Sequence, residues 1–192
     1  MKEKVWDLFV RIFHWSLVLS FTAAYLTAAY GYNETYDLDE VHEWLGYFIT
    51  ILIVLRIVWG FVGSKYARFS NFIFSPSEYI ENFKAIIGNK HIKHYMGHNP
   101  LGGAMVFALI AGLLVLTFSG LTLLGWSEYT GPVWALGISV SDSIGDLAKF
   151  IHYELSDFML VLIGAHILGV FVAMKQHSEN LVRSMFTGHK ER

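Results

Sequence analysis

The feature that most constrains this chain is the apolar stretch 150–174, which is long enough to cross a bilayer yet contains His152 and His166. Ionisable side chains within hydrocarbon are costly, so they usually face the interior of a helix bundle and serve a site there. The interval of fourteen residues is about 3.9 helical turns, so both histidines share one helix face, about 21 Å apart along the axis. Small residues beside His166 leave room for a bulky group or a close helix: Gly164, Ala165 and Gly169.

Three further apolar runs accompany this stretch, in a chain that is 54% hydrophobic and only 16% charged. Each run approaches the roughly 20 residues that a helix needs to cross the hydrocarbon core. The sequence therefore predicts an all-α fold, an integral membrane four-helix bundle that forms a single domain over residues 1–192. The predicted spans lie at about 10–32, 42–63, 100–126 and 150–174.

The chain contains no cysteine. This excludes disulfides, iron–sulfur clusters, thiolate-ligated haem and covalent haem attachment through a CxxCH motif. Any redox cofactor would therefore be held by histidine or methionine, or would be a quinone or a flavin.

The charges are sorted between the two sides of the predicted bundle. Of the 14 Lys and Arg, only Lys149 lies outside the side that holds the termini and the 64–99 loop. The positive-inside rule therefore places both termini and this loop in the cytoplasm, and the chain in the cell inner membrane. The opposite side is acidic in both of its loops: Glu34, Asp37, Asp39, Glu40, Glu43, Glu128, Asp142 and Asp146. These carboxylates are either solvated loop residues or a docking surface for a basic periplasmic partner.

Four histidines in the predicted spans fall into two pairs by depth. His42 begins the second span at the level of His152, and His14, near the start of the first span, lies at the level of His166. Two imidazoles on opposite sides of one plane are what bis-histidine haem ligation requires. The spacing therefore favours two sites, one near each membrane surface.

Two arginines lie close to these sites. Arg11 is three residues before His14 and is its neighbour on the helix surface. It either meets a haem propionate or extends to the interface beside a hydrogen-bonded interior histidine. Arg56, within the apolar part of the second span, either extends to the cytoplasmic interface or meets an inner propionate or a quinone oxygen.

The cytoplasmic loop contains a second helical signal. Apolar residues at helical spacing over about 76–88, with Pro76 at the start, predict an amphipathic helix along the membrane surface. His91, His94 and His98 follow it. They indicate either a metal site or a basic loop near lipid phosphates.

Several short motifs occur in the order of a known family. They are VWDLFVRIFHW at the start, then HEWLGY and GHNPLGG, and finally the two histidines fourteen residues apart. Over nearly its whole length the chain resembles the prokaryotic cytochrome b561 family, which includes the cytochrome b subunits of nickel–iron hydrogenases. The resemblance implies two haem b cofactors. His14 and His166 would ligate the cytoplasmic-side haem, and His42 and His152 the periplasmic-side haem.

The resemblance also implies a function. The chain would be a transmembrane dihaem b-type cytochrome, embedded in membrane lipid, that relays electrons between the membrane quinone pool and a periplasmic partner such as a basic c-type cytochrome. Arg56 and His98 are candidates for the quinone site, and quinol or quinone oxidoreductase activity is left open. Nothing in the sequence indicates nucleic-acid binding.

Three alternatives use the same scaffold. The first is a superoxide oxidase that reduces quinone, although the acidic outer loops would repel an anionic substrate. The second is a membrane anchor and electron-transfer subunit of a hydrogenase-like complex. The third is a divalent-metal transporter that uses the four histidines and Asp157, which would carry metal and no haem.

Overall fold

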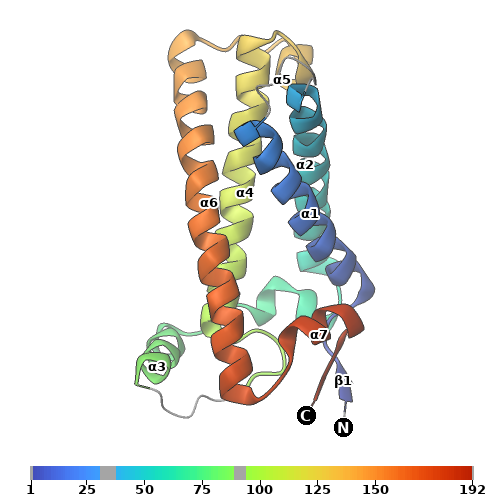
Figure 1. Cartoon of the computed structure of the whole chain (residues 1–192), viewed down its shortest axis with the longest axis vertical. Coiled ribbons are helices and arrows are strands. Elements are labelled where there is room, and N and C mark those ends of the chain that lie inside the picture. The colour runs from blue at the N-terminus through green and yellow to red at the C-terminus, as the bar shows by residue number, and fades with distance from the viewer. Residues whose placement is uncertain (1, 31–37, 89–93, 192) are drawn as a thin grey trace. The chain divides into compact units, whose positions relative to one another are not determined.

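The computed structural model describes residues 2–30, 38–88 and 94–191. Four long helices dominate it, and all four are long and apolar enough to cross a membrane. They are α1 (Leu8–Tyr30), α2 (Leu38–Val62), α4 (Pro100–Ser127) and α6 (Asp142–His177) (Figure 1). The all-α membrane fold predicted from the sequence is confirmed.

The long helices keep many apolar side chains on their surfaces. Leu19 and Val62 are each 70% exposed, and Phe118 is 67% exposed. A water-soluble domain rarely leaves such a continuous apolar surface uncovered. In lipid the same surface is stable, because a helix satisfies its own backbone hydrogen bonds there.

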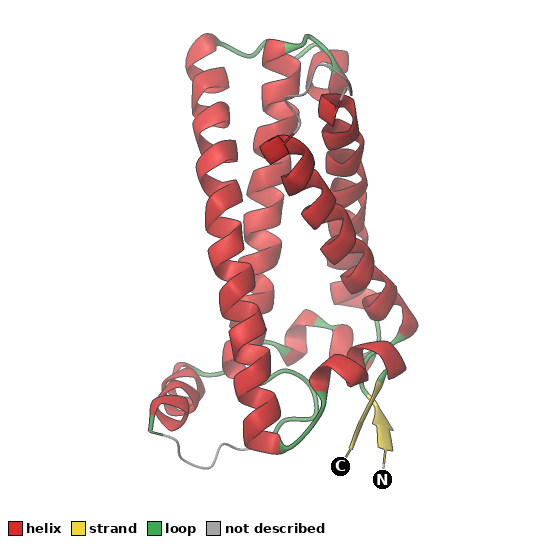
Figure 2. Ribbon diagram, viewed as in Figure 1, coloured by secondary structure: helices red, strands yellow, loops and turns green. Residues whose placement is uncertain are grey.

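The described residues form five short helical segments between and after the long helices (Figure 2). The predicted amphipathic segment is present as α3 (Pro76–Ile87), and Ser75 and Glu78 form a capping box at its start. Such a box satisfies two backbone N–H groups that a helix start leaves unpaired. The others are the 3₁₀ turns η1 (Lys65–Ala67) and η2 (Phe69–Asn71), α5 (Gly131–Ala135) and α7 (Leu181–Thr187).

A two-stranded antiparallel sheet joins the two ends of the chain, which the sequence analysis did not predict. Strand β1 (Lys2–Lys4) pairs with β2 (His189–Glu191), and Figure 1 shows them side by side next to α7. Each strand has only three residues and no alternating apolar pattern, so no strand signal was available. Trp6, directly after β1, is buried and donates from Nε1 to Ser184 Oγ of α7 at 3.1 Å.

The last long helix begins earlier than its predicted span. It starts at Asp142, whereas the apolar run starts at 150, so residues 142–149 form two helical turns and not a loop. Asp142 accepts a hydrogen bond from Trp126 Nε1 at 3.1 Å, and Gly145 lies so close to the Trp126 ring that a Cβ would collide with it. Apolarity marks where the membrane begins, while capping and packing decide where the helix begins.

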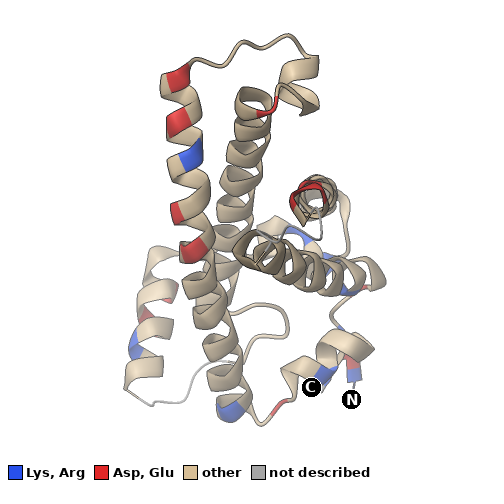
Figure 3. Ribbon diagram, turned by 45° about the horizontal axis from the view of Figure 1, so that its top comes forward, with Lys and Arg blue, Asp and Glu red and all other residues tan. Residues whose placement is uncertain are grey.

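The chain divides into two compact units. The first unit comprises Met1–Ser16, Val54–Ala108 and Leu162–Arg192, and the second comprises Leu17–Ile53 and Leu109–Val161. Each long helix contributes to both units. Every Lys and Arg of the sequence except Lys149 falls within the first unit. Along α6 alone, the acidic residues lie in the half that follows Asp142, and Lys175 lies near the other end (Figure 3).

Candidate functional site

In the second unit, His42 of α2 faces His152 of α6. Their ring centroids are 6.1 Å apart, and the ring planes are nearly perpendicular at 83°. The two residues are 110 positions apart in the sequence. The fold therefore brings together the two histidines that the depth argument paired.

Neighbouring helices orient both imidazoles through Nδ1. His42 Nδ1 lies 2.9 Å from the carbonyl oxygen of Ala24, and His152 Nδ1 lies 3.0 Å from that of Leu116. Ser119 Oγ is a further contact of His152 Nδ1 at 3.2 Å. Because a carbonyl only accepts, Nδ1 carries the proton in both rings, which leaves the Nε2 lone pairs for a metal.

This pair fits bis-imidazole ligation of one iron. A metal–imidazole bond of about 2 Å puts two opposed ligand nitrogens about 4 Å apart, and each ring centre lies somewhat farther out. The observed centroid separation of 6.1 Å agrees with that arrangement. Gly120 of α4 lies against His152, where a Cβ would press on the imidazole. A glycine there lets the ring keep its position.

In the first unit, His14 of α1 and His166 of α6 are close enough to interact electrostatically. His14 Nδ1 is buried and has no hydrogen-bond partner among the described residues, and the same holds for Nε1 of the adjacent Trp15. Buried polar atoms in folded proteins nearly always have partners. Orphaned atoms beside two imidazoles fit a site that receives a further polar or metal-bearing group.

Arg56 is part of the same unit and is only 4% exposed. Its Nη2 donates to the Ala67 carbonyl at 3.2 Å, and its guanidinium carbon lies 5.1 Å from the centre of the Phe69 ring. Its Nη1 is buried without a partner among the described residues. A buried guanidinium with a free donor is suited to hold an anionic oxygen.

Asp7 is the carboxylate that acts on Arg56 through charge, but other groups occupy its oxygens. It accepts from the backbone N–H of Val10 at 2.8 Å, from Trp59 Nε1 at 3.0 Å and from the hydroxyl of Ser64. Burial opposes ionisation, but these hydrogen bonds and the charge of Arg56 together lower the pKa of Asp7. Asp7 therefore remains charged without forming a salt bridge to Arg56.

Arg11 has backbone partners in this structure. Its Nη1 donates to the carbonyl of Phe186 at the end of α7, and its Nε lies 3.4 Å from the carbonyl of Asp7. Arg11 thus fastens α7 to the start of α1. Its predicted contact with a haem propionate remains a prediction, and it would have to coexist with these hydrogen bonds.

His98, just before α4, is a buried imidazole of the first unit that packs against aromatic rings. Its ring centroid lies 4.6 Å from that of Phe72 and 5.0 Å from that of Trp6. Its Nδ1 is buried and has no partner among the described residues. Burial, reinforced by the charges of Lys190, Arg56 and His166, lowers the pKa of His98 to about 3. His98 is therefore neutral near pH 7.

Of the three histidines before α4, His94 and His98 have different surroundings. His91 lies outside the described residues, and His94 bonds through Nε2 to Glu179 Oε1 at 2.8 Å. Within the described ranges, no group of three His, Asp or Glu is arranged to hold a metal ion by itself. Asp157, assigned to the transporter alternative, accepts a hydrogen bond from Tyr25 at 2.9 Å.

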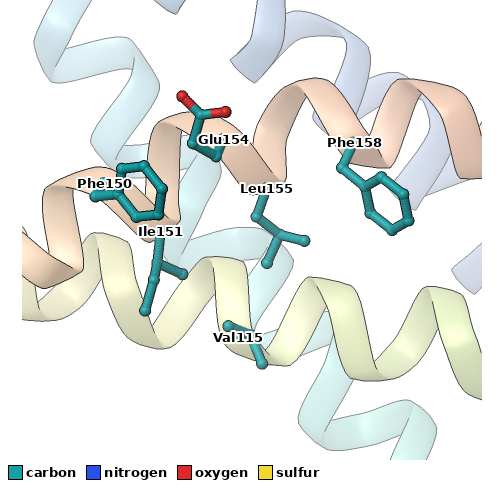
Figure 4. Close-up of a pocket in the computed structure, with 6 residues that line it drawn as sticks. All are labelled: Val115, Phe150, Ile151, Glu154, Leu155 and Phe158. Carbon is teal, nitrogen blue, oxygen red and sulfur yellow. The ribbon is translucent and has the colours of Figure 1, made fainter.

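An open groove runs along α4 and α6 in the second unit (Figure 4). Ile151 and Leu155 point toward Val115 of α4, whereas the carboxylate of Glu154 points away from α4. Phe150 and Phe158 line the remainder. An apolar seam of this kind is what lipid tails contact between two membrane helices, and it holds none of the four paired histidines.

Sequence reasoning identified the paired histidines but missed what orients them. Ala24 and Leu116 act through backbone carbonyls, which any residue would provide, so no sequence signal existed. Ser119 was a usable signal, because a hydroxyl within an apolar span needs a hydrogen-bond acceptor. It donates to the Leu116 carbonyl at 2.9 Å.

Comparison with known proteins gives one family match. The family described as prokaryotic cytochrome b561 matches residues 5–188, which is nearly the whole chain. No curated protein and no solved structure matches it. The match covers all four long helices and α7.

Proposed function

We propose that this chain, which belongs to the prokaryotic cytochrome b561 family, binds two haems and relays electrons between the membrane quinone pool and a periplasmic redox protein. Membership of the family makes it a multi-pass inner-membrane b-type cytochrome that binds haem b and transfers electrons. We refer to the haem assigned to His42 and His152 as the second-unit haem. The haem assigned to His14 and His166 is the first-unit haem.

The observation that carries this proposal is the opposed pair His42 and His152. Both rings come from membrane-spanning helices, face each other at 6.1 Å and have Nδ1 engaged by backbone carbonyls. With Nδ1–H bonded to a carbonyl, each ring keeps the Nε2 lone pair for a metal. Two such rings at this separation support ligation of one iron between them.

The haem itself supplies reversible one-electron chemistry at iron. His42 with His152, and His14 with His166, would each hold one iron through two imidazoles, which would leave no site for oxygen, so the activity would be electron transfer. Hydrogen bonds from Nδ1 to the carbonyls of Ala24 and Leu116 orient the rings and raise their basicity as ligands. The same bonds prevent ring rotation, which keeps the geometry constant when the oxidation state changes.

The two haem positions are linked by α6, which supplies one ligand to each. His152 and His166 lie fourteen residues apart on this continuous helix, a rise of about 21 Å. Electrons would thus pass between two haems that share this helix as a source of ligands. Under the positive-inside rule, both termini and the basic 64–99 loop would lie in the cytoplasm.

A basic c-type cytochrome is the partner that the charges favour on the periplasmic side. The second unit has a single basic residue, Lys149, and acidic residues at the starts of α2 and α6. Complementary charge raises the rate of encounter more than it raises affinity. The acidic field would slow an anionic substrate such as superoxide.

Electron relay can be tested in proteoliposomes that contain quinol, by following reduction of an external basic c-type cytochrome. The wild-type protein should reduce it. His152→Ala should lose the second-unit haem and the reduction, while the first-unit haem keeps its spectrum. His94→Ala, which removes a histidine outside the spans, serves as the matched control. Reduction that survives His152→Ala, or no reduction by the wild type, would refute the proposal.

A further inference from the structure

Strand β2 places a buried lysine within electrostatic range of His98. Lys190 of β2 is 7% exposed. Its Nζ lies 3.4 Å from the Gly97 carbonyl and 5.9 Å from the centre of the Trp6 ring. Trp6 in turn packs edge-on against His98. A lysine side chain is normally solvated, so its burial needs a reason.

The fold holds Lys190 in place through several contacts. In the β1–β2 pair, Lys190 lies opposite Glu3. Gly188 turns the chain from α7 into β2 with a φ of 82°, a left-handed conformation that favours glycine. Its carbonyl accepts from the backbone N–H groups of Val5 and Trp6 at 2.8 and 3.1 Å. The chain end is therefore built into the first unit and does not trail from it.

Lys190 belongs to a group of three nitrogen-bearing side chains around two aromatic rings. His98 lies against Trp6 and Phe72, and the guanidinium carbon of Arg56 is 5.8 Å from the Phe72 ring centre. Arg56 and Lys190 both act electrostatically on His98, and so does His166. We call Arg56, His98 and Lys190 the basic cluster. The electrostatic interaction of His98 with His166 connects the cluster to the first-unit haem site.

The positive charge of the basic cluster is only partly compensated by protein groups. Lys190 pairs with Glu179 at 3.8 Å, and Glu179 also bonds to His94 at 2.8 Å. Burial lowers the pKa of Lys190, although Glu179 opposes the shift. Arg56 has Asp7 within electrostatic range, but the Asp7 oxygens accept from other donors. Buried cations are stable only when paired and hydrogen-bonded.

We infer that the basic cluster is a carboxylate site that receives a propionate of the first-unit haem, so that the C-terminal strand forms part of the cofactor site. The inference rests on the proposed function. The free donor Nη1 of Arg56 and the unpartnered Nδ1 of His98 match the oxygens of a carboxylate. A neutral quinone carbonyl would add no negative charge to two cations that protein groups compensate only in part, whereas a propionate supplies it.

The test is a redox titration of the purified, quinone-free holoprotein with Lys190→Met. Removing a positive charge near a haem favours the ferric state. The ratio of reduced to oxidised first-unit haem at a fixed poised potential should fall about tenfold, as expected for a partly buried charge. The second-unit haem should be unchanged. Lys84→Met, the same change at an exposed site on α3, should leave both haems unaltered.

A second variant separates charge from packing. Lys190→Arg keeps the charge and should retain the wild-type potential, while both variants should keep two haems per chain. Equal shifts in Lys190→Arg and Lys190→Met would assign Lys190 a packing role and overturn the inference. An unchanged potential in Lys190→Met would overturn it as well.

Repeating the titration with added quinone identifies the occupant. An effect of Lys190→Met that appears only when quinone is present would place a quinone oxygen at the cluster and refute the propionate. If the wild-type protein has two low-spin haems and Lys190→Met leaves the potential of the first-unit haem unchanged, this inference alone is refuted. A wild-type protein without two haems refutes the proposed function too, so the two failures are distinguishable.

Discussion

At the scale of single residues, the account depends on how His42 and His152 are held. Their positions were predictable, because ionisable residues in apolar runs are rare and their spacing defines helix face and depth. The backbone carbonyls that orient them were not predictable, because every residue carries one. The contacts of Arg11 were missed for a related reason. Its acceptor at Phe186 lies 175 positions away, on a helix that the apolar pattern does not mark.

Gly120 gives the sharpest residue-scale prediction. Gly120→Ala should lower the occupancy of the second-unit haem at least several-fold, because the added methyl would press on the His152 imidazole and rotate it away from its hydrogen-bonded position. Haem absorbance per chain measures the effect. Gly46→Ala is the matched control, since a Cβ there meets open space. Equal haem content in both variants would show that His152 tolerates displacement.

At the scale of elements, the apolar runs predicted which helices exist, and local chemistry decided where they end. The α2 helix begins at Leu38, before the predicted 42, with Asp39 and Glu40 in its first turn, where acidic side chains favour the helix dipole. The start of α3 was predictable because Pro76 and the capping residues are local signals. The β1–β2 pair was not predictable, since it depends on α7 returning the chain to Trp6.

A hydrogen bond between α1 and α6 gives a prediction at this scale. Tyr25 donates to Asp157 at 2.9 Å within the second unit. Tyr25→Phe should lower the stability of the holoprotein, because it removes one interhelical hydrogen bond between α1 and α6. Unfolding in a denaturing detergent, followed by haem absorbance, measures it. Tyr153→Phe, an exposed tyrosine on α6, should have no effect, and equal losses in both variants would remove the role assigned to this bond.

At the scale of the whole molecule, the proposed partner docking depends on the uneven distribution of charge between the two units. The first unit holds all but one of the basic residues, and the second holds ten of the 16 acidic residues. The sequence alone revealed this asymmetry. It could not reveal the burial of Lys190, because a lysine side chain is normally expected to be solvated.

The asymmetry predicts how the protein meets its partner. Neutralising Asp39, Glu40 and Asp142 as amides should slow reduction of a basic c-type cytochrome at low salt and flatten its dependence on ionic strength, because electrostatic steering is screened by salt. Stopped-flow rates over a salt series measure both. Glu81→Gln in the first unit should leave the slope unchanged. An unaltered slope in the triple variant would exclude docking on this surface.

The most direct test of the central claim is a dithionite-reduced minus oxidised visible spectrum of the detergent-purified protein, combined with a pyridine haemochrome count of haem per chain. The account predicts two b-type haems per chain, both low-spin because each iron has two imidazole ligands. A single haem would contradict the assignment of one of the two pairs. Protein without haem would contradict the account as a whole and leave the four histidines to another metal.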